Sequence, residues 1–170
     1  MLDLSQKTDK KSAFDSVESY IQSIGLNILK KDMTRPWGGF FVIDDGSLSL
    51  FTNHFFPGID PKKSRQDQAL SPKVLLVKPQ KRLSWQYHHR RSELWKIVKG
   101  PVGIVLSEND NQTEVQSFDS GEILTIEKGQ RHRLVGLQDW GVVAEIWQHT
   151  DSSNPSDEED IVRLDDDFGR

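Results

Sequence analysis

QYHHRRSELWKIVKG, residues 86–100, combines potential metal ligands with the pattern of a β-strand. If its first part is extended, Gln86 and His88 project from the same face of the strand. Four residues separate His88 from Glu93, which is enough for the chain to turn a corner and return a carboxylate from a paired strand. The next run, residues 94–98, is rich in the aromatic and β-branched residues typical of strands. An amide, an imidazole and a carboxylate that converge from two paired strands predict a divalent metal site.

The composition limits both the size of the core and the kind of metal site. A chain of 170 residues is large enough for one core, and it contains no cysteine. Disulfides are therefore excluded, and a metal must be held by histidine, carboxylate or amide groups. No apolar run approaches the length of a membrane span, and no basic and apolar leader opens the sequence. We expect a cytoplasmic protein without a membrane partner.

Charge is distributed unevenly along the chain. Residues 151–170 carry eight acidic residues and two arginines, so the formal net charge of −4 leaves +2 on the residues before them. Residues 61–99 contain eleven lysines and arginines but only two acidic residues. Because this basic segment lacks interleaved aromatic residues for stacking on bases, it favours a small anionic ligand over a nucleic acid. An ordinary solvated basic face is the alternative.

One amphipathic helix is predicted near the start of the chain, after eleven polar residues that we expect to be frayed. Its apolar residues recur at helical spacing: Phe14, Val17, Tyr20, Ile21 and Ile24. Ser12 and Asp15 are placed like a capping box, and Gly25 is placed like a helix stop. We divide the chain into residues 1–32, with the polar start and the helix, and a domain of residues 33–170 that ends in the acidic tail.

From residue 26 onward the pattern is that of strands separated by turns. Strands are predicted over residues 26–30, 39–43, 47–51, 74–78, 83–88, 94–98, 102–107, 113–118, 123–127, 132–135 and 142–147. Many short strands in series, without helical patterns between them, predict an all-β sandwich or barrel. Residues 55–72 are predicted to form a long loop.

A fourth metal ligand can be sought among the remaining histidines. Of the five histidines in the chain, only His132 has a distinctive context, GEILTIEKGQRHRL. An apolar strand over residues 123–126 meets a turn at residues 127–129, and the chain returns through His132. Such a hairpin would bring a ligand that is distant in sequence beside the first three.

Two groups of residues have a characteristic spacing. The first is Gln86, His88, Glu93 and Gly100, and the second is Gly121, Glu127, Gly129 and His132. They resemble the two motifs of the cupins, whose fold is a double-stranded β-helix, also called a jelly-roll barrel. The resemblance implies four metal ligands: Gln86, His88, Glu93 and His132. Gln86 stands where many cupins have a histidine, which is similar to the sugar-phosphate isomerase branch.

Five segments extend the resemblance: RPWGGF (35–40), VKP (77–79), QYHHRRSELW (86–95), GQRHRL (129–134) and EDIVRLDDDFGR (159–170). Together they resemble type II mannose-6-phosphate isomerases, a cupin domain that is often fused behind a mannose-1-phosphate guanylyltransferase. The resemblance covers about residues 33–170 and no guanylyltransferase part. It implies an isomerase that interconverts mannose 6-phosphate and fructose 6-phosphate through an enediol. It also implies a divalent metal, preferably zinc, and a homodimer, which is common among cupins.

Four positions depart from the family pattern. Gln80 replaces a turn glycine, Glu127 replaces a proline, Arg90 replaces a histidine inside the first motif, and Phe168 replaces a tyrosine. Gln80 then either avoids a positive φ or strains the turn. None of these changes removes a predicted metal ligand, but they keep open the alternative of a cupin that binds a sugar or sugar phosphate without turnover.

The implied reaction needs an electrophile and a base. A Zn²⁺ ion held by one carboxylate and neutral ligands keeps a formal +1 charge and can polarise a sugar carbonyl. Glu145 and His89 are candidates for the base that moves a proton between two carbons. Glu145 could be raised in pKa by burial, or it could be a hydrogen-bond partner of His132.

Phosphate recognition requires cations, and the family motifs contain five of them: Arg35, Lys78, Arg91, Arg133 and Arg163. Arg163, which we count among the catalytic candidates, stands between two apolar residues in the acidic tail. Its alternative is a local ion pair with Asp160 or Asp166. Trp37 either lines the sugar site or belongs to an entry turn made by its neighbours.

Overall fold

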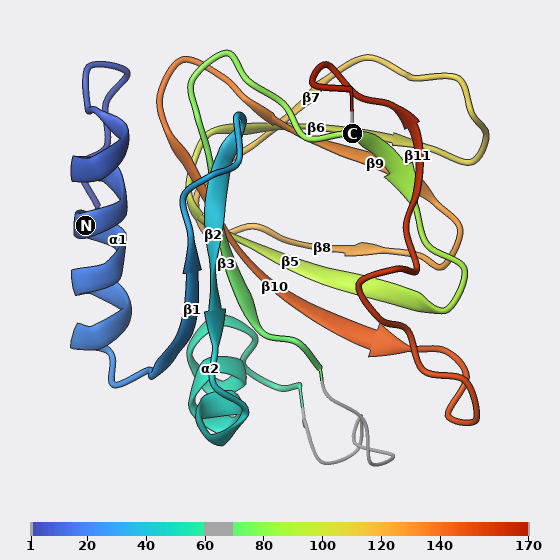
Figure 1. Ribbon diagram of the computed structural model, residues 1–170, viewed down its shortest axis with the longest axis horizontal. Helices are drawn as coiled ribbons and strands as arrows, with labels where there is room; N and C mark the ends of the chain where they lie inside the picture. Colours follow the sequence, from blue (N-terminus) through green and yellow to red (C-terminus); the bar gives the residue numbers. More distant parts are fainter. Residues whose placement is uncertain (1, 60–69, 170) are drawn as a thin grey trace.

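The computed structural model describes residues 2–59 and 70–169, which form two antiparallel sheets and two α-helices (Figure 1). The helical elements are α1 (Lys10–Ser23), the 3₁₀ turn η1 (Asp45–Ser47) and α2 (Leu48–Phe55). The strands are β1 (Ile28–Asp32), β2 (Gly38–Ile43), β3 (Lys73–Val77), β4 (Trp85–Tyr87), β5 (Arg91–Lys99), β6 (Val102–Ser107), β7 (Gln116–Phe118), β8 (Ile123–Ile126), β9 (Arg131–Gly136), β10 (Gly141–His149) and β11 (Val162–Asp165).

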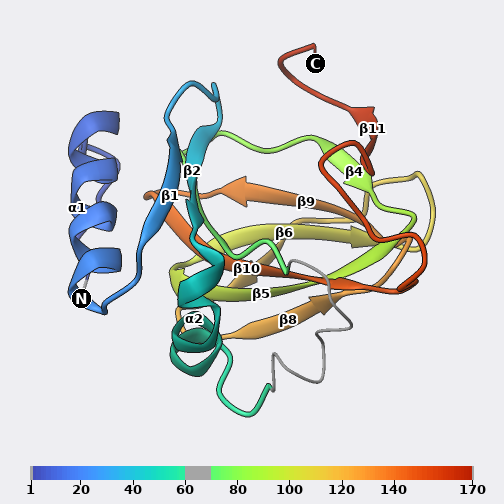
Figure 2. The same ribbon diagram turned by 60° about the horizontal axis from the view of Figure 1, so that its bottom comes forward.

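The strands form a jelly-roll barrel, as predicted. One sheet has the order β1-β2-β3-β10-β5-β8 and the other has the order β11-β4-β9-β6-β7. Figure 2 shows β9 and β6 on one side of the barrel and β10, β5 and β8 on the other. β11 comes from the acidic tail and pairs with β4, so the second half of the tail docks on the barrel. The boundary predicted at residue 33 falls between β1 and β2, which pair within the first sheet.

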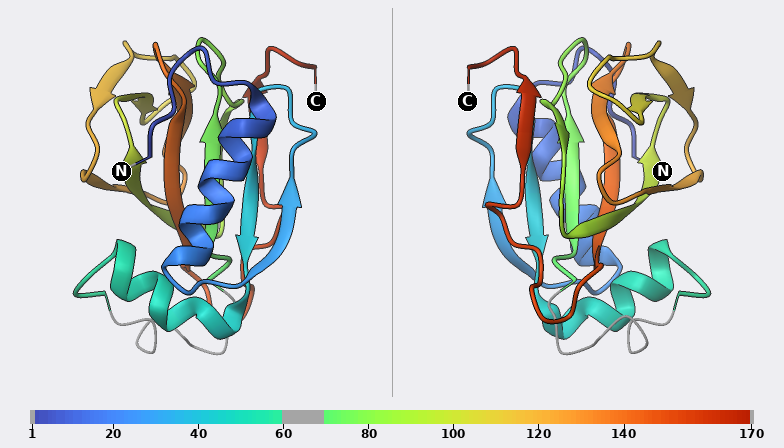
Figure 3. Two further views of the ribbon diagram at one scale, coloured as in Figure 1. Left: turned by 90° about the vertical axis from the view of Figure 1, so that its left-hand side faces the viewer. Right: turned by 90° about the vertical axis from the view of Figure 1, so that its right-hand side faces the viewer.

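Strand alternation divides the apolar residues into two cores. Val74 and Leu76 of β3 lie in the outer core, whereas Leu75 and Val77 lie in the barrel interior. The outer core is completed by the apolar face of α1, which contributes Phe14, Val17 and Ile21. Figure 3 shows α1 lying across the outside of the first sheet. The helix therefore covers a sheet face, and the central strands are buried on both sides.

The start of the chain is more ordered than its polarity indicates. α1 begins at Lys10 and is capped by Asp9, whose carboxylate accepts the N–H of Ser12 at 3.0 Å. The predicted cap at Ser12 is therefore wrong, whereas Gly25 has the expected left-handed conformation, with φ of 82°. The prediction of frayed polar residues is also wrong, because Leu4 is fully buried in the outer core.

The strand predicted over residues 47–51 is wrong, since these residues begin α2. The buried residues of α2 are Leu48, Phe51, Thr52 and Phe55, which follow the three- and four-residue spacing of a helix face. The predicted loop over residues 55–72 lies partly outside the described residues. None of the described helices combines the length and apolar character needed to span a bilayer.

Gln80 keeps the turn conformation that suits a glycine. Its φ is 58°, which costs a non-glycine residue about 1 kcal/mol. The backbone N–H of Gln80 donates to the carbonyls of Gly136 and Leu137, and its side-chain amide donates to Leu137 at 2.9 Å. Hydrogen bonds therefore hold the strained turn that the sequence departure produces.

Candidate metal centre

Two strand connections bring the candidate ligands together. β4 lies in the second sheet and β5 in the first, so the short turn after His88 crosses the barrel. β8 and β9 are likewise in opposite sheets. The two turns touch, because the N–H of Gly129 donates to the carbonyl of His88 at 2.9 Å. The sequence predicted paired strands and a hairpin, and both predictions are wrong: the ligands converge from facing sheets.

The strand registers then place the side chains. Gln86 of β4 lies directly opposite His132 of β9. Glu93 of β5 reaches the same point from the other sheet, where it lies opposite Ile126 of β8. Gln86 and His132, which are 46 positions apart in the sequence, are therefore neighbours in the fold, as the motif spacing requires.

Three buried side chains form a cluster with the donor set of a metal site. Glu93 Oε1 lies 3.2 Å from His88 Nε2, and Glu93 Oε2 lies 3.6 Å from His132 Nε2. One ligand atom from each of the three residues lies within 4.8 Å of the others. Two imidazoles and one carboxylate suit zinc and other divalent transition metals. The cluster therefore fits a divalent metal by the chemistry of its donors.

The hydrogen bonds of both histidines leave the Nε2 lone pairs directed at the cluster. His88 Nδ1 donates to the carbonyl of Asp160, and His132 Nδ1 donates to the carbonyl of Gln130 at 3.0 Å. With Nδ1 protonated, each neutral ring has its lone pair on Nε2, which is the form that binds metals. Arg91 donates to His88 Nε2 at 3.3 Å, which agrees with this tautomer.

Burial also sets the charge of the cluster. Burial lowers the pKa of His132 to about 4, although the charge of Glu93 opposes this shift, so the ring is neutral at pH 7. Burial acts to raise the pKa of Glu93, but His88, His132 and Arg91 outweigh it and hold this pKa well below its usual range. The cluster therefore contains an ionised Glu93 beside a neutral His132 at pH 7.

Gln86 is near the cluster with its amide nitrogen turned inward. Its Oε1 accepts the hydroxyl of Ser84 at 2.6 Å, and its Nε2 lies 3.5 Å from His132 Nε2. A metal binds an amide through its oxygen, so ligation by Gln86 requires the amide to rotate by about half a turn. The proposed ligation by Gln86 stays a prediction.

A cavity of about 130 Å³ lies beside the cluster and has room for on the order of ten water molecules. Seven of the residues predicted from the sequence line it: Arg35, Trp37, Gln86, Arg91, Glu93, Glu145 and Arg163. His88 and His132 lie behind this wall, buried against Glu93. The cavity therefore joins the metal cluster to most of the predicted substrate residues.

Glu145 is a buried carboxyl on the cavity wall. Its Oε1 accepts the indole N–H of Trp147 at 3.0 Å, and its Oε2 accepts that of Trp95 at 3.2 Å. Trp95 also donates to Glu93 at 3.1 Å and so links the two carboxyls. Burial and, next, the charge of Glu93 raise the pKa of Glu145 to about 7. The alternative role as a partner of His132 is not realised, because His132 Nδ1 donates to Gln130.

Three predicted site residues are not brought to the cavity. His89 is exposed and packs edge-on against Tyr87, on the side opposite to His88. Lys78 follows β3 and is absent from the cavity wall. Arg133 alternates with His132 and points away; its guanidinium donates to the carbonyl of Leu83 at 2.8 Å. The positions of these residues favour Glu145 over His89 as the base.

Arg90 and Asp160 attach the tail to the first motif. The Asp160 carboxylate accepts the backbone N–H groups of His89 and Arg90, each at 3.0 Å. The Arg90 guanidinium donates to Asn154 at 2.9 Å and to the carbonyl of Pro155 at 2.7 Å. The arginine that replaces the family histidine therefore fastens the tail segment, and it leaves the metal cluster intact.

Sequence reasoning missed several residues of the cavity wall: Phe40, Lys73, Ser84 and Glu158. The signal for Lys73 was present, because it is a lone cation at the start of a strand whose residues are all buried. Trp147 lies two residues after Glu145 and therefore shares its face of β10. Its ring lies 3.6 Å from the Arg91 guanidinium.

The geometry can be compared with known proteins. Residues 62–166 match the model of the family described as "Mannose-6-phosphate isomerase C-terminal". The chain belongs to this family. The mannose-6-phosphate isomerase C-terminal family accounts for both motifs and for β11, since all of them lie within the matched residues.

Curated relatives are longer than this chain. "Xanthan biosynthesis protein XanB" of Xanthomonas campestris pv. campestris is 28% identical over 164 residues, which are 95% of this chain and 29% of that protein. "Mannose-1-phosphate guanylyltransferase ManC" of Salmonella typhimurium is 26% identical over 142 residues, which are 84% of this chain and 24% of that protein. The chain thus spans under a third of the length of these two relatives.

Solved structures confirm the cupin fold. Oxalate decarboxylase from Lactobacillus farciminis has a TM-score of 0.53 and 15% identity, covering 80% of this chain and 33% of that chain. The capsular polysaccharide assembling protein CapF from Staphylococcus aureus has a TM-score of 0.51 and 18% identity, covering 91% of this chain and 39% of that chain. At these identities the similarity shows the fold alone.

Proposed function

We propose that the protein is a metal-dependent aldose–ketose isomerase that interconverts mannose 6-phosphate and fructose 6-phosphate through an enediol. The observation that carries this proposal is the buried Glu145, which shares one cavity with the carboxylate of the His88–Glu93–His132 cluster. Membership of the mannose-6-phosphate isomerase C-terminal family supports the choice of substrate.

The residues supply the parts of a proton transfer between neighbouring carbons. A divalent cation, for which we propose zinc, would polarise the sugar carbonyl when bound by the cluster. Glu145 takes the proton from one carbon and returns it to the next, because burial raises its pKa above that of an ordinary carboxyl. The indoles of Trp95 and Trp147 orient the carboxyl.

A coupled assay for fructose 6-phosphate, with metal-loaded protein and with protein treated with a chelator, tests the function. We expect turnover of mannose 6-phosphate that is lost with the metal and restored by added zinc. The second candidate is a sugar-phosphate-binding cupin without turnover, the alternative that the departures at Gln80, Arg90 and Glu127 keep open. Binding of mannose 6-phosphate without product in the metal-loaded protein would establish that candidate instead.

Replacement of Arg163 by glutamine is expected to raise the KM for mannose 6-phosphate about tenfold or more. Arg163 is an exposed residue of β11 that also lines the cavity, so it lies at the opening, and it pairs in register with Gln86. The loss of one charge-assisted hydrogen bond to phosphate accounts for this magnitude. Steady-state kinetics give the KM.

Arg82→Gln is the matched control for Arg163→Gln. Arg82 forms a surface ion pair with Asp167 just after β11, at 2.8 Å, and does not line the cavity. Its replacement should leave KM unchanged. If both variants raise KM equally, Arg163 acts only by holding the tail.

A further inference from the structure

Lys73 is a cation held inside the barrel. It lies directly opposite Glu145 across the β3–β10 pair and is 7% exposed. Its Nζ lies 4.3 Å from the centre of the Trp147 ring and 5.8 Å from that of Phe40. Strand backbone and two aromatic rings therefore fix this charge on the cavity wall.

The ion-pair partner of Lys73 comes from the surface. Glu158 belongs to the tail segment between β10 and β11, and its Oε1 lies 2.6 Å from Lys73 Nζ. The side chain of Glu158 is 75% exposed, whereas that of Lys73 is 8% exposed. Glu158 can thus turn into water at little cost, but Lys73 cannot follow it. A buried ammonium that loses its carboxylate needs another anion.

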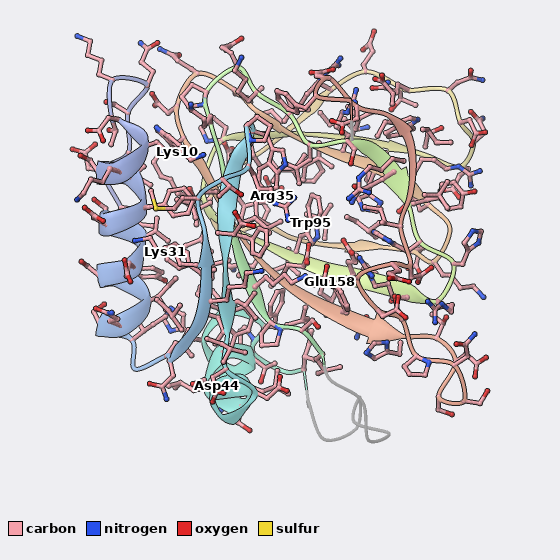
Figure 4. All side chains as sticks on the ribbon, in the orientation of Figure 1. Lys10, Lys31, Arg35, Asp44, Trp95 and Glu158 are labelled. Atoms are coloured by element: carbon pink, nitrogen blue, oxygen red, sulfur yellow. The ribbon has the colours of Figure 1, made fainter. Side chains whose placement is uncertain are left out.

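The wall around Lys73 offers further groups to such an anion. The Arg35 guanidinium lies 5.6 Å from the centre of the same Phe40 ring. Trp37 also lines the cavity, and its buried indole N–H has no hydrogen-bond acceptor among residues 2–59 and 70–169. Figure 4 shows Arg35, Trp95 and Glu158 over the centre of the barrel. Two cations and an indole donor suit an anion with several acceptor oxygens.

The strand order sets the distance between Lys73 and the metal cluster. Lys73, Glu145 and Trp95 lie opposite one another on β3, β10 and β5. At about 4.8 Å per strand, Lys73 is on the order of 10 Å from the strand that carries Glu93. A ligand that extends from the cluster to Lys73 passes Glu145 on the way.

We propose that Lys73 binds the phosphate group of the sugar phosphate, and that this phosphate displaces the Glu158 carboxylate. Glu158 then competes with the ligand for Lys73, and the phosphate group of the ligand takes the place of the Glu158 carboxylate. The identity of the sugar rests on the proposed function, whereas the anion-binding role of Lys73 does not.

Equilibrium binding to the zinc-loaded protein tests this proposal without turnover. Isothermal titration calorimetry would compare mannose 6-phosphate, mannose and inorganic phosphate. We expect Glu158→Gln to tighten the binding of both phosphate-bearing ligands about threefold to fivefold, because a competing anion is removed. Lys73→Met keeps the length of the side chain without its charge and should weaken their binding about 10- to 100-fold. Binding of mannose should not respond to either change.

Two further variants complete the design. Glu159→Gln removes a neighbouring exposed acid that is absent from the cavity wall, so it controls for the change in net charge. In the double variant Lys73→Met/Glu158→Gln, the gain from Glu158→Gln should vanish, because Glu158 acts through Lys73. Unchanged or weaker phosphate binding in Glu158→Gln overturns the proposal even if Lys73→Met fails to fold. Phosphate binding without isomerase turnover would contradict the proposed function alone, and absence of phosphate binding in the unaltered protein overturns the role of Lys73.

Discussion

Replacement of His132 by alanine is expected to lower the affinity for Zn²⁺ by at least about 100-fold and to abolish isomerase activity with it. His132 Nε2 faces Glu93 across 3.6 Å, and its ring is held for this purpose by the bond from Nδ1 to Gln130. Loss of a partner that only orients a ligand already costs about 10- to 100-fold in metal affinity, so loss of the ligand itself should cost more. Elemental analysis after dialysis against a weak chelator gives the metal content.

The control for this variant is His54→Ala. His54 is an exposed histidine on α2 whose ring contacts Tyr20, and it is not part of the cluster. Its replacement should leave the metal content unchanged. Circular dichroism of His132→Ala would show whether the barrel persists. A folded variant that retains stoichiometric zinc would exclude His132 as a ligand.

The fold could be predicted where local pattern and tertiary packing agree. β3, β5 and β10 have apolar or β-branched residues on both faces, and all three were found near their predicted positions. A strand is predicted over residues 47–51, although the buried residues of α2 have helical spacing. Spacing also predicted that the chain turns between His88 and Glu93, but not that the turn crosses between sheets. The pairing of β5 with β8, which is far away in sequence, determines that crossing.

The candidate site could likewise be predicted from the sequence only in part. The spacing of the two motifs identified the three clustered ligands, and alternation along β10 places Glu145 inside the barrel. Contacts between residues that are far apart in the sequence could not be predicted. Lys73 and Glu158 are 85 positions apart, and the bond from His88 to Asp160 joins residues 72 apart. Neither contact follows from a local pattern, because each depends on how the tail returns over the barrel.

Replacement of Glu145 by glutamine is expected to lower kcat about 10²- to 10⁴-fold while the zinc content stays unchanged. This magnitude is that of a lost general base. A purely structural role for Glu145 would instead change stability or metal content and spare the chemical step. Glu159→Gln is again the matched control, since it removes an exposed carboxylate outside the cavity. Wild-type kcat in Glu145→Gln would transfer the role of base to another residue.

The pKa of Glu145 provides a second readout that needs no substrate. In the metal-free fold this pKa is about 7, compared with the ordinary value of 4.5. The folded protein therefore keeps a proton that the unfolded chain releases, so the stabilisation is complete below pH 4.5 and is lost as the pH rises through 7. The contribution of Glu145 to the free energy of unfolding should fall by about 3 kcal/mol over this window, whereas the lowered pKa of His132 makes an opposite contribution between about pH 4 and pH 6.5. Glu145→Gln removes only the contribution of Glu145, so the stability of the variant relative to the unaltered protein should rise between pH 5 and pH 8, which urea unfolding in chelator would measure.

Metal binding should change the same pKa in the direction that catalysis requires. The charge of Glu93 is the second cause of the raised pKa, and a divalent cation bound to Glu93 offsets that charge. The pKa of Glu145 then falls below 7, so the carboxyl is ionised and can accept a proton at neutral pH. The acid limb of the kcat/KM profile should therefore lie below pH 7 in the zinc-loaded enzyme, and it should be absent from the residual activity of Glu145→Gln. An acid limb that is identical in both proteins would contradict the assignment of Glu145 as the base.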